Sequence, residues 1–188
     1  TSGSVAVTSS GDYIGGIVAY AAGGSVISNC TNNASVTYTG TASNYGYYTG
    51  GIVGYLDGSS QVTRCTNNGT ITSSHSTGGI VGYLSNGTVS YCVNFGTIAK
   101  SATFNSAGAG GGIVGMISST SGNSVSYCYS SANVTAAKYA GGIIGQIPSS
   151  SLPAGSVKFC YTNNLTSYYT VDTSISGASK GAVVGYTA

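Results

Sequence analysis

Short apolar runs bounded by glycine recur along the whole chain. A representative run, Ile52-Val53-Gly54-Tyr55-Leu56, follows a glycine pair and precedes the polar segment Asp57-Gly58-Ser59-Ser60. Short apolar runs between turn residues are typical of β-strands, whereas the apolar spacing of an amphipathic helix persists nowhere in the chain. The pattern therefore predicts an all-β protein.

The apolar runs are copies of one unit. Gly-Gly-aliphatic blocks begin near residues 15, 50, 78, 111 and 141, and an incomplete copy begins near residue 181. A repeat of about 30 residues is typical of stacked, similar units, and each unit here offers three short apolar segments between turns. We predict one β-solenoid domain over residues 1–188, with about five coils of three short strands each and corners of variable length. A segment of a longer array would show the same pattern.

The third unit carries a family resemblance. Its residues 78 to 98 contain Gly-Gly-Ile-Val-Gly-Tyr and then Gly-Thr-Val-Ser-Tyr-Cys-Val-Asn-Phe-Gly-Thr-Ile. This unit resembles GLUG-type repeats, which occur in large bacterial and protist surface proteins and in non-catalytic parts of some secreted peptidases. The resemblance implies an extracellular β-solenoid that serves as a stalk or an adhesive module, and it carries over no catalytic residue.

One cysteine occupies the same place in each complete unit. The five are Cys30, Cys65, Cys92, Cys128 and Cys160. In a solenoid they form a column with neighbours about 4.8 Å apart, and we favour a buried ladder of small apolar side chains. Vertical disulfides are an alternative, although parallel Cβ vectors are poor geometry for a bridge and an odd number leaves one thiol over. A metal or redox site is the least favoured interpretation, since His75 is the only histidine. No cofactor is expected.

Asparagines form a second recurring pattern. Asn32, Asn67 and Asn94 each follow a cysteine by two residues, and we predict an Asn ladder that turns this corner and bonds neighbouring rungs. Asn-X-Ser/Thr sequences, the acceptors of N-linked glycans, lie mostly at predicted corners, although they also arise by chance in a chain rich in Asn and Thr. The candidate glycosylation sites are Asn29, Asn33, Asn68, Asn86, Asn133 and Asn164.

Tyrosine dominates the predicted surface. Aromatic residues recur after the glycine block and directly before the cysteine, where columns of rings stabilise neighbouring rungs. The Ile-Val-Gly-Tyr strand also has apolar side chains on both faces, whereas a solvated strand alternates apolar with polar residues. An exposed stripe of Val and Tyr is therefore a candidate interaction face. Its members are Val18, Tyr20, Val53, Tyr55, Val81, Tyr83, Tyr91, Tyr127 and Phe159.

Composition excludes several classes of function. Five Lys or Arg and three Asp are the only residues with a fixed charge, and the net charge is +2. Such a weak, scattered positive charge argues against nucleic-acid binding, and no apolar run is long enough to cross a bilayer. Catalysis is not expected, because Asp12, Asp57 and Asp172 are dispersed, whereas a glycosidase needs a pair of carboxylates. A start at Thr1 without an apolar signal region indicates a processed or excised segment.

These patterns together predict a structural role. Neither end shows a charged or helical cap, and open β edges favour pairing with another chain. We predict a non-catalytic protein outside the cell or at its surface, a module of a stalk, sheath, self-assembling filament or adhesin. It associates with itself end to end or laterally, through its edges and Tyr-rich faces, and glycans are a second expected partner. The alternative is a carbohydrate- or ice-binding module, although irregular loops argue against the flat, even Thr array that ice recognition needs.

Overall fold

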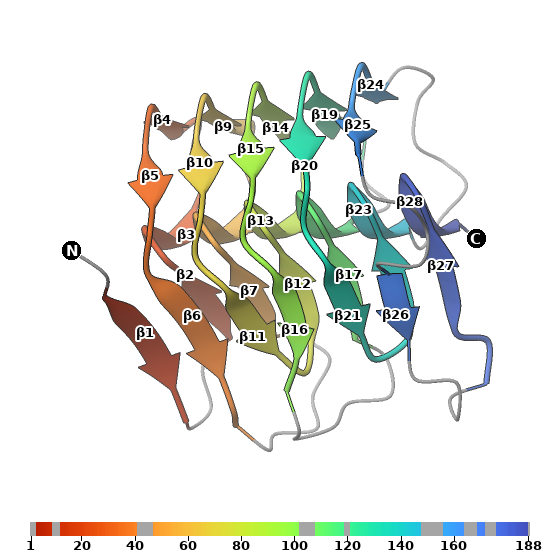
Figure 1. Ribbon diagram of the computed structural model, residues 1–188. Coiled ribbons are helices and arrows are strands. Elements are labelled where there is room, and N and C mark those ends of the chain that lie inside the picture. Colours follow the sequence, from red (N-terminus) through yellow and green to blue (C-terminus); the bar gives the residue numbers. More distant parts are fainter. Residues whose placement is uncertain are drawn as a thin grey trace.

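The chain folds as a parallel β-solenoid. The computed structural model describes residues 3–8, 12–40, 47–101, 108–118, 121–147, 156–163, 169–171 and 176–187. These residues form 28 short strands that wind in successive coils, stacked side by side (Figure 1). No helix long and apolar enough to span a membrane occurs in this part of the chain. The predicted all-β solenoid of about five coils is confirmed.

The strands form five parallel sheets, each named here by its first strand. The β1 sheet contains β1 (Ser4–Val7), β6 (Ser35–Tyr38), β11 (Ile71–Ser73), β16 (Ile98–Lys100), β21 (Val134–Ala136) and β26 (Tyr169–Val171). The β2 sheet contains β2 (Tyr13–Gly15), β7 (Tyr48–Gly50), β12 (Ser76–Gly78), β17 (Ala109–Gly111), β22 (Tyr139–Gly141) and β27 (Ser179–Gly181).

The other three sheets complete each coil. The β3 sheet contains β3 (Val18–Ala21), β8 (Val53–Leu56), β13 (Val81–Leu84), β18 (Val114–Ile117), β23 (Ile144–Ile147) and β28 (Val184–Thr187). The β4 sheet contains β4 (Val26–Ser28), β9 (Ser60–Thr63), β14 (Gly87–Ser90), β19 (Ser124–Ser126) and β24 (Val157–Lys158). The β5 sheet contains β5 (Thr31–Asn32), β10 (Thr66–Asn67), β15 (Val93–Asn94), β20 (Tyr129–Ser130) and β25 (Tyr161–Thr162).

Each complete coil has five strands, so the prediction of three strands per coil was wrong. The second coil runs through β7, β8, β9, β10 and β11. Its apolar run is divided by a bend at Gly51 and Ile52, where the N–H groups of Ile52 and Val53 both donate to the Ile80 carbonyl, at 3.0 and 2.9 Å. Its cysteine segment is divided at Arg64, whose φ of 52° is left-handed and cannot continue a strand. Both divisions depend on backbone geometry that the apolar pattern does not record.

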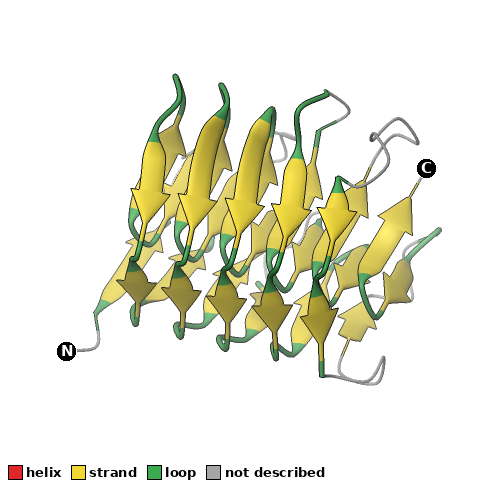
Figure 2. Ribbon diagram, turned by 90° about the horizontal axis from the view of Figure 1, so that it is seen from above, coloured by secondary structure: helices red, strands yellow, loops and turns green. Residues whose placement is uncertain are grey.

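Neighbouring coils pair in register, so equivalent residues form straight columns. Figure 2 shows the coils following one another along one direction, with parallel strands in every sheet. Val53, for example, pairs with Val18 on one side and with Val81 on the other. The side chain at each position of a coil therefore lies next to its counterparts one rung away, about 4.8 Å distant.

Two separate hydrophobic cores run along the stack. One lies between the β3, β4 and β5 sheets and contains Leu56, Val62 and Cys65, all fully buried. The other lies between the β1 and β2 sheets and contains Val36 and Ile71, also fully buried. Alternation of side chains along the short strands sends every second residue into one of these cores.

Glycine allows the β2 and β3 sheets to approach each other backbone to backbone between the two cores. A Cβ atom at Gly82 would lie 2.6 Å from the Gly54 carbonyl oxygen and 2.7 Å from the Thr49 nitrogen, both in the preceding coil. A Cβ atom at Gly79 would overlap the Asn94 amide of its own coil and the Gly112 carbonyl of the next. In the inner coils, the glycines of the recurring block therefore fill positions that no side chain fits.

Candidate interaction surfaces

The five cysteines form one column at the corner between the β4 and β5 sheets. All are free thiols; the three in the middle coils are fully buried, and Cys30 and Cys160 are half-buried. In every coil the thiol donates a hydrogen bond to the carbonyl of the residue two positions earlier, at 3.2 to 3.4 Å. The four later thiols also reach a carbonyl of the preceding coil, at 3.6 to 3.8 Å. The thiols thus close the corner and join the coils.

Stacking changes the acidity of these thiols. The Cys128 thiol lowers the pKa of Cys92, but the interaction with Cys65 and burial outweigh it and raise this pKa to about 12. The same interactions set the pKa of Cys128: the Cys160 thiol lowers it, while the interaction with Cys92 and burial outweigh this effect and raise it to about 12. The Cys65 pKa is lowered instead, because its interaction with Cys92 exceeds the opposing effect of burial.

Iodoacetamide at pH 8.5 is expected to modify Cys92 and Cys128 about a thousandfold more slowly in the folded protein than in urea. The reactive thiolate is scarce when the pKa lies near 12 instead of 9.0, and both sulfur atoms are buried. Peptide mass spectrometry over a time course measures each rate. Cys30, half-buried in the first coil, is the internal control and reacts first. Equal rates in folded and unfolded protein would contradict the buried column.

The asparagine column forms a continuous hydrogen-bonded chain beside the cysteines. Asn32 Nδ2 donates to Asn67 Oδ1, and Asn67 Nδ2 donates to Asn94 Oδ1, both at 2.8 Å. Each amide also closes its own corner: in the second coil Asn67 Nδ2 donates to the Gly69 carbonyl at 2.9 Å and Asn67 Oδ1 accepts from the Gly69 N–H at 3.3 Å. All three side chains are buried. Ser130 takes the position in the fourth coil, where its Oγ accepts from the Ala132 N–H at 3.2 Å.

The candidate glycosylation sites differ in accessibility. Asn33, Asn68 and Asn133 are exposed, and Asn68 Nδ2 donates to Asn33 Oδ1 at 2.8 Å. Asn29 is also exposed and Asn86 is half-buried, and both have left-handed φ angles, of 55° and 53°. Asn164 lies outside the described residues. Glycosylation stays a prediction.

The valines of the candidate interaction face are not exposed, and this part of the prediction was wrong. Val53 and Val81 are fully buried, and Val18 of the first coil is half-buried. The bend after the glycine pair turns these side chains into the core between the β3, β4 and β5 sheets. The opposite face of the strand meets the β2 sheet through glycine, not solvent. Both faces carry apolar residues because both are covered, as is usual for parallel sheets.

The aromatic members of that predicted face divide into two surfaces. The first, which we call the tyrosine cluster, consists of Tyr13, Tyr20, Tyr48, Tyr55 and Tyr83 on the β2 and β3 sheets of the first three coils. Its ring centroids lie 4.3 to 6.1 Å apart. Burial raises the pKa of Tyr48, Tyr55 and Tyr83, while Tyr13 and Tyr20 are 37% and 49% exposed. Tyr13 and Tyr20, both in the first coil, are thus the exposed members of the cluster, and the other three tyrosines are half-buried.

The second surface, which we call the aromatic corner, follows the cysteine column through coils three to five. Tyr91, Tyr127 and Phe159 stack one rung apart, with centroids 4.8 and 5.0 Å apart and ring planes 3° and 17° apart. The Arg64 guanidinium lies 5.9 Å from the Tyr91 centroid and extends the stack. On the other side of the cysteines Phe95, Tyr129 and Tyr161 form a looser column, with centroids 6.1 and 4.8 Å apart.

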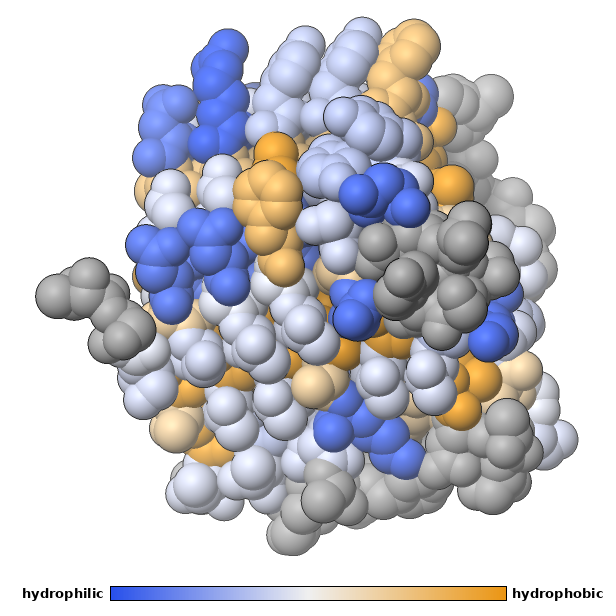
Figure 3. All heavy atoms as spheres, in the orientation of Figure 1, coloured by the Kyte–Doolittle hydropathy of each residue, from blue (hydrophilic) through white to orange (hydrophobic). Residues whose placement is uncertain are grey.

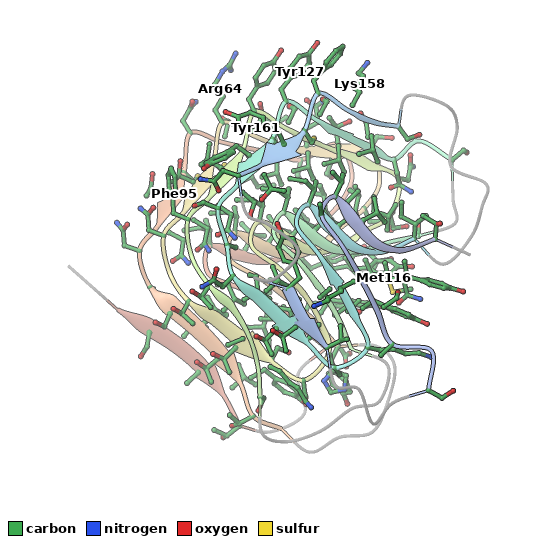
Figure 4. All side chains as sticks on the ribbon, turned by 45° about the vertical axis from the view of Figure 1, so that its right-hand side comes forward. Arg64, Phe95, Met116, Tyr127, Lys158 and Tyr161 are labelled. Carbon is green, nitrogen blue, oxygen red and sulfur yellow. The ribbon has the colours of Figure 1, made fainter. Side chains whose placement is uncertain are left out.

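The two surfaces lie on different sides of the molecule. Figure 4 shows Arg64, Tyr127 and Lys158 projecting from one edge of the stack, with Tyr161 beside them. Met116, which continues the Tyr83 column in the next coil, lies on another side. The two surfaces can therefore contact different partners.

A third face, on the β1 sheet, is polar and without charge in its first strands. Exposed Ser35 is followed one and two coils later by exposed Thr70 and Thr97, and Thr37 pairs with Thr72. Figure 3 shows this near face as mostly pale, near-neutral side chains, with strongly hydrophilic side chains towards β5 and β10. This face contrasts with the aromatic corner beside it.

Sequence patterns had indicated only part of these surfaces. Tyr13 and Tyr48 each precede the first glycine of a block by two residues, and this repeated position could have added them to the cluster. Phe95, Tyr129 and Tyr161 lie one or three residues after a cysteine, so their spacing was also visible. The left-handed backbone conformation of the residue before each cysteine corresponds to no recurring residue type in the sequence.

In the part of the chain that the structure describes, no three His, Cys, Asp or Glu side chains are grouped to hold a metal ion.

Comparisons with known proteins identify the repeat. The family model of the GLUG motif matches residues 10–37 and 45–72, whereas residues 78–98, which carry the resemblance noted above, form the third coil outside both matches. No curated protein and no solved structure matches the chain. The protein therefore carries the GLUG motif, once in each of the first two coils of its β-solenoid.

Proposed function

We propose that this chain is a non-catalytic structural repeat module that works outside the cell or at its surface, as part of a stalk, sheath, filament or adhesin. The observation that carries the proposal is that the recurring residues serve coil stacking: the glycines allow close approach, Asn67 bonds both neighbouring coils, and Cys65 reaches the preceding coil. Such a coil adds length and rigidity. The role of each module then depends on the exposed residues that differ between coils.

The tyrosine cluster supports lateral contact with a second copy of the chain. Tyr13 and Tyr20 expose apolar ring surface, and the three half-buried tyrosines of the cluster pack beside them. Clustered tyrosines bury large areas at interfaces at a small loss of side-chain entropy. With charged residues at 4% and a net charge of +2, copies repel each other weakly. Two copies can therefore bring these clusters together with little electrostatic cost.

Self-association is expected to increase with concentration in sedimentation velocity experiments, and electron microscopy is expected to show oligomers or filaments. The double variant Tyr13→Ser/Tyr20→Gln is the test, because Ser76 and Gln146 hold the same columns in later coils and the fold accepts them. It is expected to weaken association about tenfold or more. A wild-type chain that stays monomeric at high concentration would refute self-association, and an unchanged double variant would refute the role of the cluster.

A further inference from the structure

The residue before each cysteine adopts a left-handed backbone conformation in all five coils, with φ between 52° and 55°. Asparagine is among the few residues other than glycine that tolerate this conformation, and Asn29 occupies it in the first coil. Tyr91, Tyr127 and Phe159 place bulky rings there, against the steric preference of the backbone. Side chains held in such a conformation point to a role beyond local structure.

The first two coils show that stacking does not require these rings. The Asn29 N–H donates to the Thr63 carbonyl at 3.2 Å, and the Tyr91 N–H donates to the equivalent Ser126 carbonyl at 3.1 Å. The backbone and its hydrogen bond are thus the same with an Asn or a Tyr at the corner. Across the cysteine, Thr31 and Thr66 likewise hold the column that Tyr129 and Tyr161 continue. The aromatic residues are confined to coils three to five although the fold accepts polar ones.

The rings of the aromatic corner are open to solvent. Tyr91, Tyr127 and Phe159 are 53%, 45% and 67% exposed, and Phe95 and Tyr161 are 56% and 63% exposed. Coils rise by about 4.8 Å, more than the contact distance of two flat rings, so parallel rings touch only when tilted and offset. Each ring therefore leaves part of its face uncovered. The corner presents a convex, ridged row of ring faces and tyrosine hydroxyls, and exposed apolar patches of this kind mark binding sites.

Two cations border this row, and no acidic residue lies among its members. Arg64 extends the Tyr91 stack on one side, and exposed Lys158 directly precedes Phe159 on the other. Three rungs separate these two residues, about 14 Å along the stack. Charge complementarity therefore favours an anionic ligand, but two cations are too few for the dense phosphates of a nucleic acid.

We infer that the aromatic corner binds a linear, uronate-containing polysaccharide. Apolar C–H faces of sugar rings pack on the electron-rich faces of Tyr91, Tyr127 and Phe159. The sugar hydroxyls bond the tyrosine hydroxyls, and Arg64 and Lys158 pair with carboxylates along the polymer. A linear polysaccharide repeats a rigid ring along its length, as the corner repeats an aromatic ring at each coil. This inference does not depend on self-association, which involves the tyrosine cluster on another side.

Isothermal titration calorimetry with polygalacturonate, and with its neutral methyl ester as the matched ligand, tests this inference. Polygalacturonate is expected to bind, and added NaCl is expected to weaken the binding because it screens the carboxylate pairs. The triple variant Tyr91→Asn/Tyr127→Asn/Phe159→Asn is expected to reduce the affinity about tenfold or more. Its Asn residues are those that the first coil uses at this corner, and thermal melting verifies that it folds. The Tyr13→Ser/Tyr20→Gln variant is expected to bind as the wild type does.

A second measurement does not depend on the variants. Nitration of Tyr91, Tyr127 and Tyr161 by tetranitromethane is expected to slow when polygalacturonate is present, while nitration of Tyr20 continues unchanged. Three results would overturn the inference: no binding of polygalacturonate, equal binding of the methyl ester, or equal binding by the folded triple variant. None of them bears on sedimentation of the wild-type chain, so the two proposals fail separately.

Discussion

Replacing Gly82 with alanine is expected to lower the free energy of unfolding by about 3 kcal/mol. The new methyl group would lie within 2.9 Å of three backbone atoms of the preceding coil. Backbone atoms cannot rotate aside, so the β3 and β2 sheets must separate and loosen the hydrogen bonds of both coils. Urea unfolding followed by circular dichroism measures the change.

The chain supplies a matched control at the same position of the repeat. Ala19 replaces the third glycine of the block in the first coil and is exposed. Because a side chain here points at the preceding coil, an alanine fits where β3 is the outermost strand of its sheet. Ala19→Gly is therefore expected to change stability by less than about 1 kcal/mol. Similar losses for Gly82→Ala and Ala19→Gly would show that close approach of the sheets is not what selects glycine.

Replacing Asn67 with alanine is expected to cost about 4 kcal/mol, because several buried polar groups lose a partner at about 1–3 kcal/mol each. The variant loses the bonds to Asn32 and Asn94 and both bonds to the Gly69 backbone. The Asn67 side chain is fully buried, so these groups have no contact with bulk solvent in the folded protein. The same urea experiment measures the loss.

Two further substitutions distinguish the stability that comes from the Asn bonds between coils from the stability that comes from the Asn bonds within one corner. Asn67→Ser is expected to lose about half as much, since a serine hydroxyl closes the equivalent corner at Ser130 but cannot bridge two coils. Asn68→Ala, next in the chain but exposed, is expected to change stability by no more than about 0.5 kcal/mol. If Asn67→Ala were as mild as Asn68→Ala, the buried amide chain would not be a source of stability.

Much of the fold could be predicted because repetition makes positions comparable. The spacing of the glycine blocks and cysteines indicated the coils, and in-register stacking then placed Tyr20, Tyr55 and Tyr83 in one column. The number of strands per coil could not be obtained this way. Strand β9 ends before Arg64 because the backbone of Arg64 is left-handed. The residue type does not predict this conformation, since Asn, Arg, Tyr and Phe all occupy the position in different coils.

The candidate surfaces required more than the pattern. Alternation along one strand suggested that Val53 and Tyr55 share an exposed face, yet Val53 enters a core and Tyr55 joins the tyrosine cluster. The bend at Gly51 and Ile52 comes before the strand and turns Val53 into the core, and the contact between the β2 and β3 sheets covers the face that was expected to be open. Burial at such a position is a property of two sheets together, which no single strand specifies.

The amino-acid sequence by itself determined that the chain is a stack of similar coils, because backbone pairing between repeats needs only strand and turn residues that recur in the same order, while corners of variable length take up the differences in spacing. Only the tertiary structure decided which faces of each coil meet solvent. The first and third glycines of each block, such as Gly78 and Gly82, let the β2 and β3 sheets touch and so divide the interior into two cores. A left-handed residue before each cysteine turns the aromatic corner outward. These outcomes depend on distances between segments about 30 residues apart, which local propensities do not encode.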